Sequence, residues 1–136
     1  PEESSEFLPL LEEAGVDPIY LLAPNSTGER IQRMGRLGRG YLYYVSLKGV
    51  TGASHLDLGS VEGKLAEIRS LTDLPVGVGF GVKDAETASA IGRIADGVVV
   101  GSALVSKIEA SVDEPGRALD GIVGVLKSMR AALDAT

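Results

Sequence analysis

The alternation of short apolar runs with longer amphipathic stretches is the feature that most constrains the fold of this chain. Four runs are rich in β-branched and aromatic residues, and each is bounded by Gly, Pro or Asp. They cover residues 18–22, 41–46, 76–80 and 97–100. The runs are apolar on both faces, which is typical of strands in a parallel sheet that is covered by helices. The sequence therefore predicts four parallel strands.

The amphipathic stretches between these runs carry helix-start signals. The predicted first residues are Ser26, with Glu29 at capping-box spacing, Ser60, Asp84 and Pro115. Two further helices are expected at 5–14, before the first strand and closed by Gly15, and at 103–110, after the fourth strand. The order α-βα-βα-βα-βα predicts an α/β fold whose parallel strands are joined by right-handed crossovers.

The chain is short for a complete barrel of such units. Four βα units are half of an eightfold (β/α) barrel, which typically takes about 250 residues. The sequence has 136 residues and is expected to open on a helix, so we expect a preceding strand to be missing. No linker or low-complexity segment divides residues 1–136, which we interpret as a single unit of about four βα units preceded by a helix.

Composition and charge disfavour several classes of partner. The net charge is −6, and the Lys and Arg residues are scattered among the acidic ones, so neither nucleic acid nor an anionic membrane is an expected partner. No apolar run approaches the roughly 20 residues of a membrane-spanning helix. The absence of cysteine is compatible with a cytoplasmic protein. His55 is the single histidine, which disfavours a metal site or a Ser-His-Asp triad.

Three glycine-rich loops follow predicted strands, and the carboxyl ends of parallel strands share the edge where such folds bind ligands. They are residues 48–53, in a loop long enough to act as a lid, residues 77–82, and Gly101-Ser102-Ala103. A Gly-Ser step at a helix start offers unpaired backbone amides, a hydroxyl and the positive end of the helix dipole. That combination predicts a phosphate site.

Structural readings of the same residues stay open. A glycine after a strand can serve backbone geometry alone, although three such loops together favour a ligand site. The 77–82 loop approaches a dinucleotide fingerprint, but Val82 stands where the third glycine belongs. Strand alternation places Tyr41 and Tyr43 on one face and Tyr44 on the other, and core or rim packing is the more typical role for such rings.

Taken together, these segments resemble the carboxyl-terminal half of the tryptophan synthase alpha subunit. The matching stretches are Pro1-Glu2-Glu3-Ser4, Ala23-Pro24-Asn25, Gly40 to Ser46 with Gly49-Val50-Thr51-Gly52, Gly79-Phe80-Gly81 and Gly101-Ser102-Ala103. The run from Gly40 to Gly52 is the most specific of them. The resemblance implies the second half of a TIM (β/α)8 barrel that cleaves indole-3-glycerol phosphate, by a retro-aldol step, into indole and glyceraldehyde 3-phosphate. It implies no cofactor for this half-reaction.

The resemblance also assigns roles to residues. The substrate phosphate would be held by backbone amides matching Gly52, Gly81, Gly101 and Ser102. Tyr43 and Phe80 would line the aromatic pocket, and Thr51 would belong to the closing lid. One departure is visible, because the family commonly has Arg in the lid where this sequence has Leu47.

A larger departure concerns catalysis. The family's two catalytic carboxylates belong to the second and third barrel strands, so we expect no catalytic residue in this chain and no activity from it alone. The expected partners are the tryptophan synthase beta subunit, which takes the indole onward with pyridoxal phosphate, and either the missing N-terminal half or a second copy of this chain. Two alternatives stay open: another phosphorylated-sugar barrel enzyme, or a non-catalytic half-barrel that serves as an assembly module.

Overall fold

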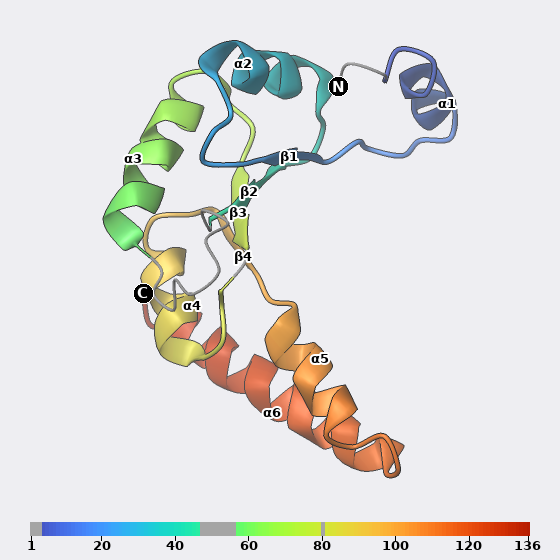
Figure 1. Ribbon diagram of the computed structural model, residues 1–136, viewed down its shortest axis with the longest axis vertical. Coiled ribbons are helices and arrows are strands. Elements are labelled where there is room, and N and C mark those ends of the chain that lie inside the picture. Colours follow the sequence, from blue (N-terminus) through green and yellow to red (C-terminus); the bar gives the residue numbers. More distant parts are fainter. Residues whose placement is uncertain (1–3, 47–56, 80) are drawn as a thin grey trace.

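Four parallel strands and the helices that follow them make up the computed structural model, which describes residues 4–46, 57–79 and 81–136. Helices and strands alternate in the predicted order (Figure 1). The elements are α1 (Leu8–Glu13), β1 (Tyr20–Leu22), α2 (Gly28–Leu37), β2 (Leu42–Val45), α3 (Leu58–Arg69), β3 (Val76–Gly79), α4 (Ala85–Gly92), β4 (Gly97–Val99), α5 (Ser102–Glu109) and α6 (Pro115–Asp134).

The sheet has the order β1-β2-β3-β4, and every neighbouring pair is parallel. Tyr43 is in register with Leu21 on one side and with Gly77 on the other, and Gly77 in turn is in register with Gly97. All four strands therefore end at one edge, as the sequence predicts for this class of fold.

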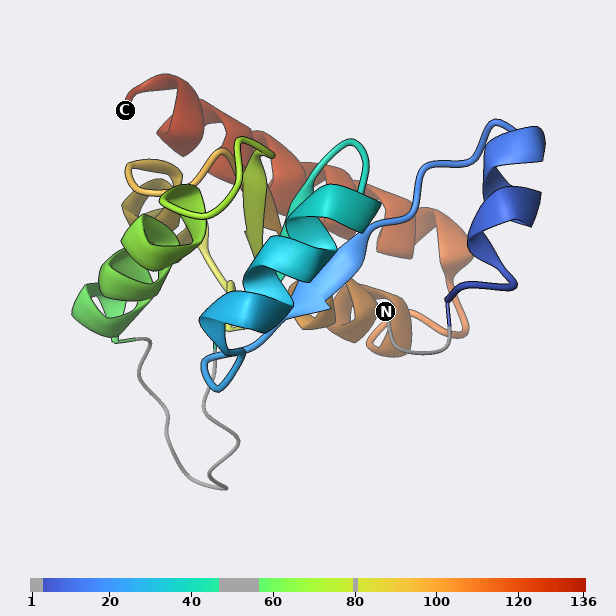
Figure 2. The same cartoon turned by 90° about the horizontal axis from the view of Figure 1, so that it is seen from above.

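The core lies between one face of the sheet and the helices α2, α3 and α4, which follow that face in Figures 1 and 2. The buried strand residues are Leu22, Leu42, Tyr44, Val76 and Val78, and the helices contribute Ile31, Met34, Val61, Leu65, Ile68, Ala88 and Ile91. Tyr44 is thus a core residue. Two effects raise the pKa of its hydroxyl: burial, which is the larger, and the nearby Glu67 carboxylate. We attribute most of the stability to this layer, because burying apolar side chains dominates folding.

Two predicted helix caps were wrong by one to three residues, and the first helix begins at Leu8 instead of near residue 5. Thr27 caps α2 by accepting a hydrogen bond from the Arg30 amide, whereas the Ser26 hydroxyl turns back and accepts from the Ala23 amide at 3.0 Å. Helix α3 begins before Ser60, because the Asp57 carboxylate accepts from the Ser60 amide at 3.2 Å. In both cases a nearby polar residue occupies the capping position in place of the predicted one.

The second face of the sheet carries no helix among the described residues, as Figure 1 shows for the space between α1 and α5. Its side chains come from alternate strand positions, beginning with Leu21 on β1 and Tyr43 on β2. Gly77, Gly79 and Gly97 follow on the next two strands, with Val99 beside them. We call this surface the open face; it is defined by Leu21, Tyr41, Tyr43, Gly77, Gly79, Gly97 and Val99.

Helices overhang the sheet beyond both of its outer strands. Helix α1 buries none of its residues and stands apart from the sheet beyond β1 (Figures 1 and 2). Beyond β4, α6 packs against α4, and α5 packs against α6. No helix in the described part of the chain is long and apolar enough to cross a membrane.

Candidate functional site

Two of the predicted phosphate-binding glycines lie side by side at the carboxyl edge of the sheet. Gly79 is in register with Val99. Gly81 lies two residues after Gly79, and Gly101 lies two residues after Val99, so both are in the loops that follow these adjacent strands. Neighbouring strands are about 4.8 Å apart, so both loops open onto the same small region. Gly81 has a φ of 79°, a conformation that glycine adopts without steric cost and that L side chains rarely adopt.

Helix α5 differs at its first residue from the other helices that follow strands. Side chains cap α2, α3 and α4, through Thr27, Asp57 and Asp84 respectively. Gly101 occupies the capping position of α5, where no side chain caps the helix. The first amides of a helix have no acceptor inside it, so those of Ser102 and Ala103 point out of the helix with the positive end of its dipole.

The space in front of Gly101 is open. A Cβ placed on Gly101 would meet no heavy atom within 4 Å, and both Gly101 and Ser102 are exposed. The Asp84 carboxylate beside this region is already engaged, since it accepts hydrogen bonds from the amide and hydroxyl of Thr87 at 2.8 and 2.6 Å. Both bonds lower the pKa of Asp84, and the bond from the Thr87 hydroxyl has the larger effect. Asp84 therefore stabilises its own helix, and no side chain caps the amino-terminal end of α5.

Tyr43 approaches the same edge across the open face. Its ring lies over Gly79, where an added Cβ would stand 3.2 Å from the ring atom Cε1 and closer still to the hydroxyl. Tyr41 lies over Gly77 in the same way, with 3.3 Å between an added Cβ and two ring atoms. The two glycines give room to the two rings, and this places the half-buried Tyr43 beside the carboxyl ends of β2 and β3.

Sequence reasoning missed the pairing of these residues and the role of Ser46. The available signal was the equal spacing of the two pairs, Tyr41 with Tyr43 and Gly77 with Gly79. Residues two apart on a strand lie on the same face of the sheet, so two large side chains on one strand can lie over two glycines on the next. Ser46 follows β2 directly, and both its amide and its hydroxyl donate to the Gly79 carbonyl, at 3.1 and 3.0 Å. Ser46 thereby fixes the position of β3 immediately before the Gly81 loop.

Three predicted site residues lie outside the described residues. These are Thr51 and Gly52, in the expected lid, and Phe80, in the expected aromatic pocket. His55 is also outside them. The structure thus brings Tyr43, Gly81, Gly101 and Ser102 to one edge, and the expected contributions of the other three residues stay predictions.

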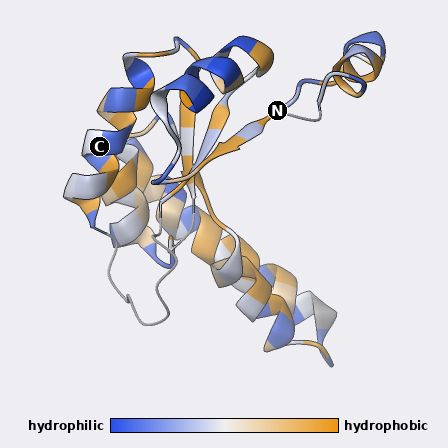
Figure 3. Cartoon of the chain, turned by 45° about the horizontal axis from the view of Figure 1, so that its top comes forward, coloured by the Kyte–Doolittle hydropathy of each residue, from blue (hydrophilic) through white to orange (hydrophobic). Residues whose placement is uncertain are grey.

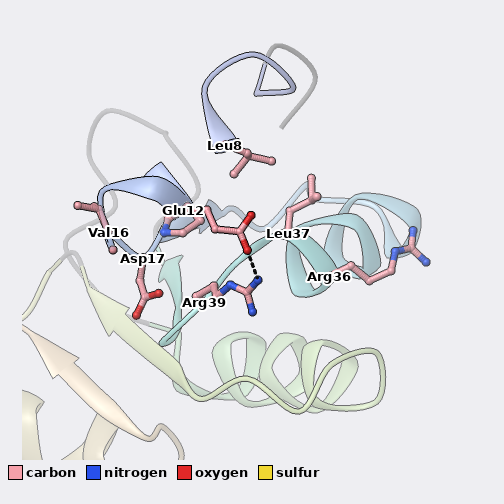
Figure 4. Close-up of a pocket in the computed structure, with 9 residues that line it drawn as sticks. Leu8, Glu12, Val16, Asp17, Arg36, Leu37 and Arg39 are labelled. Carbon is pink, nitrogen blue, oxygen red and sulfur yellow. Dashed lines mark ion pairs between the residues drawn. The ribbon is translucent and has the colours of Figure 1, made fainter. Parts of the chain in front are cut away.

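Figure 4 shows a separate hollow of about 480 Å³ at the opposite, amino-terminal edge of the sheet, between α1 and α2. Leu8, Val16 and Leu37 line it, and Glu12 and Arg39 form an exposed ion pair at 3.8 Å on its wall. It is remote from Gly101, which lies at the carboxyl ends of the strands. Within residues 4–46, 57–79 and 81–136, no group of three or more His, Cys, Asp or Glu side chains could hold a metal ion.

Comparison with known proteins extends over the whole chain. A profile of the tryptophan synthase alpha chain family matches residues 1–134. The chain is 70% identical to the tryptophan synthase alpha chain of Methylococcus capsulatus over 135 residues, which are 99% of this chain and 51% of that protein. It is 52% identical to the corresponding Burkholderia mallei chain, covering 98% of this chain and 49% of the relative. The chain thus spans about half the length of the curated relatives that it matches.

Solved structures agree with this assignment. The alpha subunit of Legionella pneumophila tryptophan synthase matches all of this chain and 49% of its own, with a TM-score of 0.85 and 32% identity. The A-subunit from Pyrococcus furiosus matches 96% of this chain and 51% of its own, with a TM-score of 0.77 and 30% identity. The predicted fold class, parallel βα units from a TIM (β/α)8 barrel, is confirmed. With its sequence and its sheet in agreement, the chain belongs to the tryptophan synthase alpha chain family.

Proposed function

We propose that this chain supplies the phosphate-binding half of a tryptophan synthase alpha barrel, which acts in tryptophan biosynthesis and cleaves indole-3-glycerol phosphate to indole and glyceraldehyde 3-phosphate. The observation that carries the proposal is the amino-terminal end of α5. It combines an open Gly101, outward amides at Ser102 and Ala103, and no capping side chain. A phosphate ester is the ligand class that suits such a helix end.

The remaining site residues would orient the rest of the substrate. In this proposal the amides of Gly81, Gly101 and Ser102 hold the phosphate together with that of Gly52, and Tyr43 and Phe80 line the indole pocket. Thr51 belongs to the lid. Binding energy from the phosphate would hold the scissile carbon–carbon bond in one orientation, which is how groups remote from the reacting atoms contribute to catalysis.

Catalysis itself would depend on the other half of the barrel. Retro-aldol cleavage needs a group that removes a proton from the substrate hydroxyl and a group that protonates the indole ring carbon. The Asp84 carboxylate, which precedes α4, is engaged with Thr87 as a helix cap. We therefore infer that the acid and base come from the first half of the barrel, that this chain alone is inactive, and that the beta subunit receives the indole.

Replacing Gly101 tests the phosphate site. Gly101→Asp places a carboxylate where the phosphate would bind, and Asp is a favourable capping residue, so the helix should be retained. We expect glycerol 3-phosphate, followed by 31P NMR titration of the chain, to bind at least about tenfold more weakly, because two anions compete for one set of amides. Gly116→Asp is the matched control. It adds the same charge to the first turn of α6, where a Cβ also meets nothing within 4 Å.

Equal binding by the wild-type chain and Gly101→Asp would contradict the phosphate assignment. The lyase assignment has a separate readout, in which the chain is mixed with the separately expressed first half of the Methylococcus capsulatus relative. Release of indole from indole-3-glycerol phosphate by the mixture, and not by either part, is expected. A well-folded mixture that binds glycerol 3-phosphate but releases no indole would refute the lyase proposal and leave the phosphate site intact.

A further inference from the structure

Ser46 holds β3 at the point where the chain leaves this strand for the Gly81 loop. It follows β2 directly, and its amide donates to the Gly79 carbonyl at 3.1 Å, which continues the β2–β3 ladder beyond Val45. Its hydroxyl donates to the same carbonyl oxygen at 3.0 Å. A parallel ladder is built from backbone groups alone, so the hydroxyl bond is an additional restraint on Gly79.

The Gly79 carbonyl belongs to a stretch of backbone that its own sequence restrains weakly. A peptide unit is planar, so fixing its oxygen also fixes the direction in which the chain leaves Gly79. Glycine has the widest backbone freedom of any residue, and Gly81, two positions further on, has a φ of 79° that L side chains rarely adopt. A bond from the neighbouring strand therefore selects one backbone path among many.

The other end of the Gly81 loop is anchored by different residues. Val82 is 3% exposed and belongs to the core, and the Asp84 carboxylate caps α4 through the amide and hydroxyl of Thr87. Gly81 thus lies between an anchor in the core and the anchor that Ser46 provides. Ser46 is not a core residue, so its hydroxyl can be removed without opening a cavity there.

The bond between Ser46 and Gly79 lies in the middle of the sheet, where β2 and β3 are each paired on both sides. The strands carry mostly apolar or intermediate colour in Figure 3, whereas strongly hydrophilic colour lies on the helices and connections. Ser46 is a half-buried residue at the end of this apolar sheet, and such a hydroxyl keeps a protein partner because leaving it unpaired costs free energy. The bond is thus independent of what lies beyond β1 and β4.

From these contacts we propose that Ser46 is a positioning residue for the substrate phosphate. Its hydroxyl holds the peptide unit after Gly79, so that the Gly81 amide is in place before the anion binds. This role rests on the phosphate site proposed above, in which Gly81 is one of the amide donors. Donors that are already in place bind more tightly than donors that must be ordered during binding. Ser46 therefore raises the affinity for a phosphate ester without contacting it.

Three replacements of Ser46 separate the effect of its hydroxyl from that of its shape. Ser46→Ala removes the hydroxyl, Ser46→Thr keeps it, and Ser46→Val has the shape of threonine without it. In a 31P NMR titration with glycerol 3-phosphate, we expect Ser46→Ala and Ser46→Val to bind about three- to tenfold more weakly than wild type, which corresponds to the loss of one hydrogen bond. Ser46→Thr should bind within about twofold of wild type, since its hydroxyl can donate in the same way.

Ser70→Ala is the matched control for the loss of a serine hydroxyl. The Ser70 hydroxyl also donates to a backbone carbonyl, that of Glu67 at 2.7 Å, but it lies at the C-terminal end of α3, near the opposite edge of the sheet. Ser70→Ala should bind glycerol 3-phosphate as wild type does, even where both alanine variants lose similar stability. Far-UV circular dichroism at the temperature of the titration verifies that each variant is folded.

A measurement without ligand distinguishes positioning from a general loss of stability. The 15N order parameter of the Gly81 amide should fall in Ser46→Ala and Ser46→Val, and it should keep the wild-type value in Ser46→Thr and Ser70→Ala. The amides of α4, which begins after the Gly81 loop, should keep their order parameters in all four variants.

Four results would overturn the proposal. Equal binding by wild type and Ser46→Ala, together with weakened binding by Gly101→Asp, would refute the positioning role and leave the phosphate site intact. An unchanged order parameter of Gly81 in Ser46→Ala would do the same. Binding by Ser46→Thr that is as weak as that of Ser46→Ala would show that the hydroxyl is not responsible. A wild-type chain that does not bind glycerol 3-phosphate would refute the phosphate site and, with it, this role of Ser46.

Discussion

At the scale of single residues, the glycines of β3 are explained by the rings that lie on them. Gly77 and Gly79 leave room for Tyr41 and Tyr43, and this lets two aromatic rings lie flat on a sheet whose other face is filled by helices. Tyr44, one position away, points into the core. The same stretch of β2 thus supplies both the core and the site.

A graded series of alanine substitutions follows from these contacts. Gly79→Ala should lower the free energy of unfolding by about 1–3 kcal/mol, because the new Cβ overlaps the Tyr43 ring and the ring must move. Gly77→Ala should cost less, since its Cβ would lie 3.3 Å from the Tyr41 ring. Gly101→Ala has open space for its Cβ but puts a poorer residue at the capping position of α5, so it should cost only about 0.5–1 kcal/mol. Urea unfolding followed by circular dichroism measures all three.

The double variant Gly79→Ala with Tyr43→Leu isolates the cause of the effect. If ring overlap is responsible, the smaller side chain should recover most of the stability that Gly79→Ala loses relative to Tyr43→Leu alone. Additive losses in the double variant would instead mean that the glycine is needed for the strand backbone itself.

At the scale of elements, Asp96 joins β4 to two neighbouring elements, α3 and β3, at the amino-terminal edge of the sheet. It lies just before β4, and its carboxylate accepts from the Val76 amide at 2.9 Å and from Arg69 at 3.1 Å. Val76 is the first residue of β3 and Arg69 is the last of α3. The bond from Val76, and then those from Arg69, lower the pKa of Asp96 against the opposing effect of burial.

The sign of this pKa shift predicts a dependence of stability on pH. A lowered folded-state pKa means that the carboxylate contributes stability above its unfolded pKa of about 3.9 and loses that contribution as the pH falls through the folded value. Asp96→Asn should therefore reduce the free energy of unfolding at pH 7, by less than about 1 kcal/mol because the side chain is 45% exposed. The difference from wild type should be constant from pH 7 to about 5 and shrink below about pH 4.

Asp73→Asn, at an exposed position in the connection between α3 and β3, is the control for the loss of one negative charge. It should stay near the wild-type stability across this pH range. A destabilisation by Asp96→Asn that persists unchanged to pH 2.5 would show that the amide group disturbs packing and that charge is not the cause.

At the scale of the whole molecule, stability should decrease from the centre of the sheet to its two sides. Strands β2 and β3 are each paired on both sides and lie over the core helices. Helix α1 buries none of its residues, and its Glu12 forms an exposed ion pair with Arg39 at 3.8 Å. Pairs of this kind contribute about 0–1 kcal/mol.

Native-state hydrogen exchange on the 136-residue chain measures this gradient. We expect amides of β2 and β3 to exchange slowest, near the global unfolding free energy, and those of α1 to exchange with almost no protection. Helix α4 is the comparison, since it is also short but buries Ala88 and Ile91. Equal protection of α1 and α4 would contradict this distribution of stability.

Local sequence signals determined a large part of this structure. Runs that are apolar at successive positions predicted the four parallel strands, because strands of a parallel sheet lack the alternating polar residues of a sheet with one solvated face. The order of elements and the position of the glycine loops at the carboxyl edge followed from the same alternation. The Gly101-Ser102 step indicated a helix end able to bind an anion, because unpaired amides are a property of any helix start.

Tertiary structure decided what depends on neighbours distant in sequence. It held the turn before α2 through Lys64 of α3, whose ammonium group donates to the Ser26 carbonyl at 2.7 Å. It also set the tyrosines over the glycines of the next strand and joined Ser46 to Gly79. These arrangements require a particular strand register. Register is fixed by packing of the whole sheet against its helices, and local propensity does not encode it.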